Sequence, residues 1–74
     1  MRIYTNKNFS VPAEAFGISA SDNGYVLNYS VDGVTFTAYS TATPANEVLF
    51  VVGLPKHCVY KLVSNTDEEL LLQY

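Results

Sequence analysis

Apolar and polar residues alternate with a period of two along much of the chain, which is the pattern of half-buried β-strands. The clearest case is the pair of runs at 25–31 and 34–39, which flank Asp32-Gly33. Asp-Gly is a favoured two-residue hairpin loop because both of its positions need positive φ, which these residues tolerate. The pattern therefore predicts a β-hairpin over residues 25–39.

The two-residue loop also predicts the register of this hairpin. One face would hold the pairs Val31 with Val34, Tyr29 with Phe36 and Leu27 with Ala38. The other face would hold Ser30 with Thr35, Asn28 with Thr37 and Val26 with Tyr39. The first face places every large apolar pair in the core, and the second faces water.

Three further strands are expected in the second half of the chain. Residues 47–53 (EVLFVVG) are apolar at both parities, as in a central strand that is covered on both sides by a second sheet or by a neighbouring subunit. Residues 58–63 alternate, residues 64–67 supply turn chemistry, and residues 70–74 form a last strand that holds the final residue in a sheet.

The amino-terminal third carries a weaker pattern. Residues 3–5 and 9–11 predict short strands, and residues 12–17 (PAEAFG) predict a turn or one helical turn. A regular succession of short strands with turn-rich connections is typical of sandwiches and small barrels. We therefore predict an all-β fold, a small antiparallel β-sandwich or partly open barrel of six to eight short strands, with residues 1–74 as a single domain.

Size and composition predict that the domain needs a partner surface. A single core in a chain of 74 residues supplies only about 3–5 kcal/mol of stability. The one cysteine, Cys58, cannot form an internal disulfide, and His57 beside it falls short of a zinc ligand set. Hydrophobic residues make up 49% and charged residues 15%, against a usual charged share of about 25%. Oligomerisation or docking is the remaining source of stability.

Charge and targeting signals narrow the partners further. The net charge is −3, and the basic residues Arg2, Lys7, Lys56 and Lys61 are dispersed, so nucleic-acid binding is disfavoured. The first residues lack the apolar core of a secretory signal, and no apolar run reaches the roughly 20 residues that span a bilayer. We expect a protein that is made in the cytoplasm, without membrane or nucleic-acid partners.

Candidate catalytic and ligand-binding groups are few. His57-Cys58 could pair a base with a nucleophile, but neighbouring strand residues point to opposite faces, which favours a core Cys58 and a loop His57. Asp67-Glu68-Glu69 could bind calcium, although three carboxylates in one turn favour a solvated hairpin end. The glycines form no phosphate-cradling motif. We predict no catalytic residues, no metal ligands and no cofactor.

The aromatic residues give the candidate binding surface. On the polar face of the expected hairpin, Tyr39 stands with Asn28 and Thr37. A tyrosine among amides and hydroxyls can stack on a sugar, and tyrosine is also enriched at protein interfaces. The preferred interpretation is a protein interface, with a carbohydrate platform and plain solvated surface as alternatives.

Two resemblances accompany these patterns. The segment 29–36 (YSVDGVTF) is similar to the aromatic-Ser-x-Asp-Gly hairpin of discoidin-type carbohydrate-binding domains. Those domains are about twice as long, usually carry tryptophan where Phe36 stands, and bind ligand through loops without a counterpart here. The likeness is confined to the hairpin, so it implies no binding residues.

The whole chain resembles the small accessory virion proteins of tailed bacteriophages, including the crAss-like phages of Bacteroides, through the runs 45–54 and 59–67. The resemblance implies a non-enzymatic virion protein made in the host cytoplasm, an auxiliary capsid or decoration subunit that binds the major capsid protein or itself. The alternative is a carbohydrate-binding adhesion module. Protein partners and a homo-oligomer are expected, and a glycan is an open option.

Overall fold

The computed structural model describes residues 1–55 and 57–74 and confirms the all-β fold class. Eight strands form two four-stranded sheets in which every pairing is antiparallel. The strands are β1 (Arg2–Tyr4), β2 (Asn8–Ser10), β3 (Ala15–Ile18), β4 (Val26–Ser30), β5 (Thr37–Ala38), β6 (Leu49–Val52), β7 (Val59–Val63) and β8 (Glu69–Gln73). The described part of the chain contains no helix long and apolar enough to cross a bilayer.

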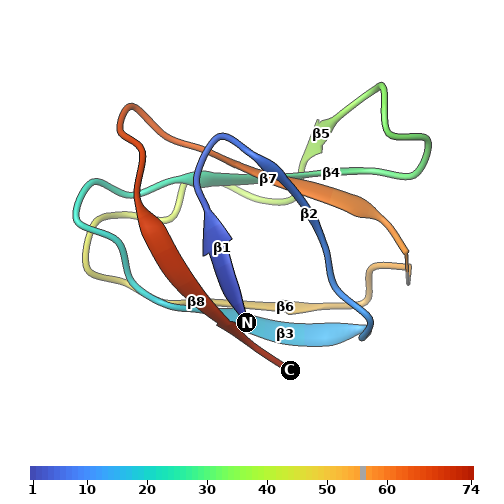
Figure 1. Cartoon of the computed structure of the whole chain (residues 1–74), viewed down its shortest axis with the longest axis horizontal. Helices are drawn as coiled ribbons and strands as arrows, with labels where there is room; N and C mark the ends of the chain where they lie inside the picture. The colour runs from blue at the N-terminus through green and yellow to red at the C-terminus, as the bar shows by residue number, and fades with distance from the viewer. Residues whose placement is uncertain (56) are drawn as a thin grey trace.

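The two sheets pack face to face as a small sandwich (Figure 1). Sheet I has the strand order β1-β8-β3-β6, and sheet II has the order β2-β7-β4-β5. Consecutive strands often lie in different sheets, so most pairings join segments far apart in the sequence. The edges of sheet I are β1 and β6, and the edges of sheet II are β2 and β5.

The core is built from the inward-facing row of each strand, as the period-two pattern requires. On β8, Leu70 and Leu72 are buried while Leu71 between them is exposed. The Tyr60 ring meets the Phe16 ring of the opposite sheet edge to face, with the centroids 5.2 Å apart, a favourable aromatic geometry. The buried apolar residues are Ile3, Val11, Phe16, Ile18, Tyr25, Leu27, Val51, Cys58, Tyr60, Leu62, Leu70 and Leu72.

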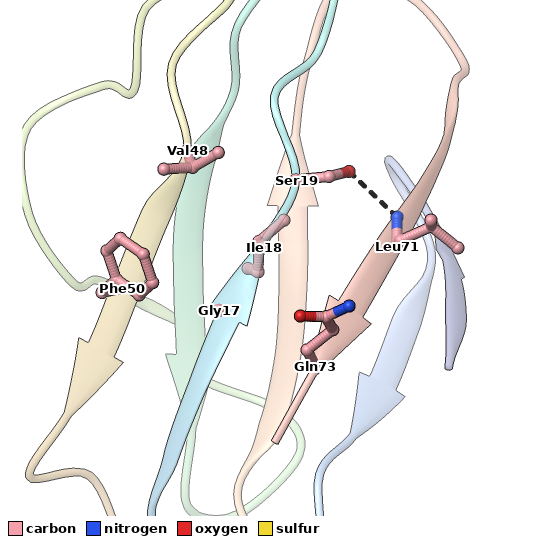
Figure 2. Close-up of a pocket in the computed structure, with 7 residues that line it drawn as sticks. All are labelled: Gly17, Ile18, Ser19, Val48, Phe50, Leu71 and Gln73. Carbon is pink, nitrogen blue, oxygen red and sulfur yellow. Dashed lines mark hydrogen bonds between the residues drawn. The ribbon is translucent and has the colours of Figure 1, made fainter.

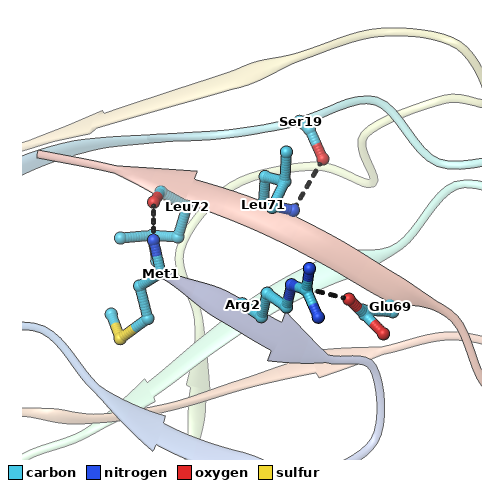
Figure 3. Close-up of polar contacts among 6 residues, drawn as sticks. All are labelled: Met1, Arg2, Ser19, Glu69, Leu71 and Leu72. Atoms are coloured by element: carbon cyan, nitrogen blue, oxygen red, sulfur yellow. Dashed lines mark hydrogen bonds and ion pairs between the residues drawn. The ribbon is translucent and has the colours of Figure 1, made fainter.

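The amino terminus is held against the last strand of the chain. The Met1 ammonium group donates to the Leu72 carbonyl oxygen at 2.9 Å, and Arg2 lies 3.3 Å from Glu69 (Figure 3). The expected strand at the carboxyl end is confirmed as β8, but it ends at Gln73. The prediction that the final residue lies in a sheet was wrong, because Tyr74 follows the strand and is exposed.

The hairpin is confirmed as an antiparallel pair of β4 and β5, but its predicted register was wrong by one residue. Asn28 lies opposite Ala38 and Tyr29 opposite Thr37, whereas the two-residue loop required Asn28 opposite Thr37. The Tyr39 N–H donates to the Leu27 carbonyl oxygen at 2.8 Å, which continues the observed register. A shift of one residue exchanges the faces of β5 relative to β4.

The physical reason for the shift is the side chain of Asp32, which organises a wider loop. Its Oδ1 accepts hydrogen bonds from the Val34 and Thr35 N–H groups at 2.8 and 2.9 Å and from the Ser30 hydroxyl at 2.8 Å. The Ser30 Oγ in turn accepts from the Gly33 N–H at 2.8 Å. Asp32 thus satisfies backbone donors that a tight hairpin would pair across strands.

Two other strand assignments also required correction. The segment 12–17 was expected to form a turn or helical turn, but Ala15–Ile18 is β3, an interior strand of sheet I that pairs with both β6 and β8. The segment 47–53 was expected to form a central strand covered on both sides, but β6 is an edge strand. Sheet II covers its Val51 row, and the row of Phe50 remains exposed.

Candidate interaction surface

The outer face of sheet I carries a contiguous group of exposed apolar side chains. Phe50 and Val52 lie on β6, Val48 comes directly before it, and Leu71 lies on β8, two strands away. Figure 2 shows Val48, Phe50 and Leu71. The exposed fraction is 74% for Phe50 and 54% for Leu71. We call Val48, Phe50, Val52 and Leu71 the outer apolar patch.

The register of β3 explains how these residues come together across the sheet. Gly17 lies opposite Phe50 on one side and opposite Gln73 on the other. Because Gly17 has no side chain, the Phe50 ring can lie over it, and a Cβ atom added at Gly17 would be 3.4 Å from the ring. An aromatic residue across from a strand glycine covers backbone that would otherwise face water. The patch therefore extends from β6 across β3 to β8.

A shallow hollow of about 250 Å³ lies between these strands. Its lining residues are Gly17, Ile18, Ser19, Val48, Phe50, Leu71 and Gln73 (Figure 2). Pockets for small molecules usually measure about 300–1,000 Å³ and enclose most of the ligand. A smaller and shallower apolar hollow fits one or two protruding side chains of a protein partner.

The backbone of β6 presents an open sheet edge beside the patch. The Ser19 N–H donates to the Leu71 carbonyl oxygen at 2.9 Å, so the backbone groups of Ser19, and by alternation those of Gly17, point toward β8. Gly17 and Phe50 therefore form a non-hydrogen-bonded pair, and the Phe50 N–H and C=O point away from β3. These two groups face the open edge of the sheet.

The Tyr39 hydroxyl confirms the direction of this edge. Its Oη lies 3.4 Å from the Val52 carbonyl oxygen and 3.5 Å from the Val52 nitrogen. Val52 is two residues from Phe50, so the backbone groups of both residues point to the same side. Both distances are at the long limit for hydrogen bonds, so Tyr39 covers this end of β6 weakly.

The structure does not bring the three predicted surface residues together. Tyr39 is half-buried against the core, on the same face of sheet II as Leu27. Thr37 lies opposite Tyr29 and shares its face, whereas Asn28 is on the other face, opposite Ala38. The one-residue shift in register separates them. Their roles as interface or glycan-facing residues stay predictions.

The remaining candidate groups occupy separate environments. Cys58 is buried in the core, as expected, and His57 is an exposed residue with φ of 67°. In the acidic turn, Asp67 accepts from the Asn6 amide at 3.0 Å, Glu68 accepts from the Asp22 N–H at 2.8 Å, and Glu69 pairs with an arginine. Among the described residues, no three metal-ligating side chains come together.

The outer face of sheet II mixes polar residues such as Asn28 and Lys61 with valines such as Val63, and it is partly covered by the loop between β4 and β5. The Lys61 ammonium group lies 4.9 Å from the centre of the Phe36 ring, a cation–π distance. Hydrogen bonds from the Thr35 and Val34 N–H groups, and then from the Ser30 hydroxyl, lower the pKa of Asp32 from 3.8 to about 2. Charge and hydrogen bonds thus hold this loop on its own sheet.

A second hollow, of about 350 Å³, lies at one end of the sandwich. Its lining residues are Asn23, Gly24, Tyr25, Val26, Ala42, Thr43, Pro44, Val63, Ser64 and Asn65. Tyr25 is the aromatic residue among them, but its side chain is buried and its hydroxyl donates to the Ser19 carbonyl oxygen at 3.3 Å. Burial raises the pKa of Tyr25 to about 12. This tyrosine cannot offer a free face for sugar stacking.

Sequence reasoning missed the outer apolar patch. The signal was present, because residues 47–53 are apolar at both parities and one of the two rows had to be covered by something. That pattern was assigned to a central strand, whereas the structure leaves Phe50 and its row exposed at an edge. The contribution of Leu71 depends on a register between β3 and β8 that no local pattern reveals.

No family model, curated protein or solved structure matches this chain. The function must therefore be inferred from the chemistry and geometry of its own residues.

Proposed function

We propose that this chain is a non-enzymatic structural subunit that docks on another protein through the outer apolar patch, as an auxiliary capsid subunit docks on the major shell protein of a virion. The observation that supports the proposal is the patch itself, with Phe50 exposed to 74% beside Leu71 exposed to 54%. Exposed apolar groups that lie together, beyond scattered single residues, mark protein interaction sites.

The chemistry of the patch favours a protein partner. The side chains that form it are uncharged, and apolar area of this kind gains roughly 25 cal/mol per Å² when it leaves water. Aromatic residues dominate the energetics of protein interfaces, and their centres are depleted of charge. The shallow hollow between Phe50 and Leu71 would receive one apolar side chain of the shell protein, with Gln73 and Ser19 at its border.

The proposal is tested on purified virions. We expect quantitative mass spectrometry to find the wild-type chain in particles that survive density-gradient purification, and to find at least about tenfold less of Phe50→Ser/Leu71→Ser, because hot-spot truncations cost 2 kcal/mol or more. The matched control is Val31→Ser/Val34→Ser, which removes two valines that are 76% and 81% exposed elsewhere. Control particles should retain the chain.

Two results would overturn the proposal. Absence of the wild-type chain from purified virions would contradict a structural role in the particle. A double variant at Phe50 and Leu71 that assembles as well as the wild type, with its fold intact by circular dichroism, would show that docking uses another surface.

A further inference from the structure

We infer that β6 of one chain pairs antiparallel with β6 of a second copy, about a two-fold axis at Phe50. This pairing would join two copies of sheet I, each of four strands, into one continuous sheet. The inference concerns the backbone edge of β6 and self-association in solution, so it goes beyond the proposed function and does not depend on it.

The open edge of β6 sets the class of occupant. The Phe50 N–H and C=O point away from β3, as the Ser19 hydrogen bond and the Tyr39 contact show. A row of unpaired backbone groups at a sheet edge is a template for another strand. A helix or a flat side-chain surface could not pair with it, so the occupant is a β-strand.

The other edge of sheet I is protected in a way that β6 is not. On β1, Arg2 forms an ion pair with Glu69 of the neighbouring strand at 3.3 Å, which places charge along that edge. Charged residues on edge strands discourage pairing with other chains. The four residues of β6, Leu-Phe-Val-Val, are all apolar.

Self-complementarity points to a second copy as the occupant. An isologous interface requires that residue i of one copy meets residue j of the other, and j meets i. With Phe50 on the axis, Val48 lies opposite Val52 of the second copy, and Leu49 lies opposite Val51. Residues that pair then share a face, because Leu49 and Val51 are on the inner row while Val48, Phe50 and Val52 are on the outer row.

Charge is compatible with this register. The residues that flank the paired segment 48–52 are Glu47 and Gly53, and the two-fold axis would place each glutamate opposite the glycine of the other copy. No carboxylate is then set directly against its own copy across the pair.

The Tyr39 hydroxyl is the internal competitor for this edge. It occupies the Val52 backbone at 3.4 and 3.5 Å, distances of weak hydrogen bonds. In the proposed dimer, the backbone N–H and C=O of Val48 from the second copy would replace the Tyr39 hydroxyl and form two hydrogen bonds with the Val52 backbone. Tyr39→Phe should therefore strengthen self-association, since it removes the competing hydroxyl and keeps the ring.

The size of the contact predicts its strength. Standard interfaces bury about 800 Å² per partner, roughly a fifth of the 4465 Å² that this chain exposes. One short strand and its outer row bury less than that, and such contacts form transient complexes. We expect a dimer with a dissociation constant in the micromolar range.

Variants that place charges across the two-fold axis test the inference. Sedimentation experiments at protein concentrations from about 1 µM to about 1 mM measure how strongly each variant dimerises. Val48→Lys/Val52→Lys would set lysine opposite lysine and weaken the dimer at least about tenfold. Val48→Lys/Val52→Glu would set lysine opposite glutamate twice and restore it. Within one chain the two positions are about 13 Å apart, so they cannot pair with each other.

The matched control is Val31→Lys/Val34→Lys, which makes the same charge change on exposed valines of the loop and should leave the dimer intact. Circular dichroism and thermal melting verify that each variant is folded. The pairing would be supported if Val48→Lys/Val52→Lys loses the dimer, Val48→Lys/Val52→Glu restores it, and the control variant keeps it.

Three results would overturn it. A wild-type chain that stays monomeric to about 1 mM leaves the edge to a strand of another protein. A dimer that survives in Lys/Lys uses a different surface. A Lys/Glu variant that stays as weak as Lys/Lys rules out the register at Phe50. Each of these can occur while the chain still binds virions, so the proposed function is judged separately.

Discussion

The two sheets of this sandwich have similar inner faces and different outer faces. On sheet II, Lys61 lies under the Phe36 ring, and a loop organised by Asp32 closes over the strands. On sheet I, Phe50 and Leu71 are exposed near the open edge of β6, and the Arg2–Glu69 ion pair lies on the same face at the β1 side. A loop of the chain itself covers part of one outer face, whereas Phe50 and Leu71 on the other stay exposed.

The difference shows which apolar residues the fold needs. Inner-row side chains such as Leu27, Leu62 and Leu72 are buried to a few per cent exposure, so their transfer from water drives folding. The outer row of sheet I stays in water in the isolated chain and contributes little to folding. Its apolar character is what the proposed association would require, and the following variants test the division between the two faces.

The largest effect is expected from neighbouring leucines on β8. Leu72→Ala removes a fully buried side chain and should cost about 2–5 kcal/mol, comparable to the whole stability of so small a domain. Leu71→Ala, one residue away on the outer face, should change the free energy of unfolding by less than about 0.5 kcal/mol. Denaturant unfolding monitored by tyrosine fluorescence measures both, and equal losses would contradict the division between faces.

The Asp32 loop offers a second test, through pH. The folded-state pKa of Asp32 is about 2, below its ordinary value of 3.8, so the carboxylate stabilises the fold above pH 4. This contribution should be lost as pH falls from about 4 toward 2, when the folded state also takes up the proton. Asp32→Asn should lower the melting temperature at pH 7, and the difference from wild type should shrink over that range.

The control for this experiment is Asp22→Asn, which removes one charge at another exposed position. A difference between Asp32→Asn and wild type that is constant from pH 7 to pH 2 would show that the loop hydrogen bonds do not depend on the charge.

A smaller effect is expected from filling the floor of the hollow on sheet I. Gly17→Ala would place a methyl group 3.4 Å from the Phe50 ring, an ordinary van der Waals distance. It should stabilise the fold by about 0.4–1 kcal/mol, because alanine restricts the unfolded chain more than glycine does. Binding to the proposed protein partner should weaken at the same time, which a pull-down beside the melting curve would reveal. Unchanged binding would place the partner away from the hollow.

An effect of similar size is expected on the outer face of sheet II. Phe36→Leu keeps an apolar side chain and removes the aromatic face above Lys61, so it should cost about 0.5–1 kcal/mol. A double-mutant cycle with Lys61→Gln isolates this coupling. Coupling near zero would mean that Lys61 does not help to hold the loop on its sheet.

Local alternation was enough to predict some strands and not others. It identified β7 and β8, because each is a run of several residues with a clear period of two. The same alternation predicted that Cys58 points into the core. It missed β3, where Ala15–Ile18 offers only two large apolar residues within a Pro- and Gly-containing segment. It also failed on the hairpin register, since the Asp32 side chain competes with the backbone pattern of a tight turn.

The sequence predicted that the chain has an interaction surface, but it did not predict which residues form that surface. An apolar composition with few charges indicated that some surface must be covered, but the chosen residues, Tyr39, Asn28 and Thr37, depended on the incorrect register. The patch at Phe50 and Leu71 requires β3 to lie between β6 and β8. That arrangement joins segments more than 20 residues apart, and local patterns carry no information about it.

The sequence by itself determined the fold class and the alternation of inward and outward residues, because a period of two is a property of the strand alone. Only the tertiary structure decided which strand ends a sheet and which residues lie across from one another. Edge position depends on where every other strand pairs, so the same apolar run could be a covered centre or an open edge. In this chain β6 is an edge strand, and its outer row is exposed.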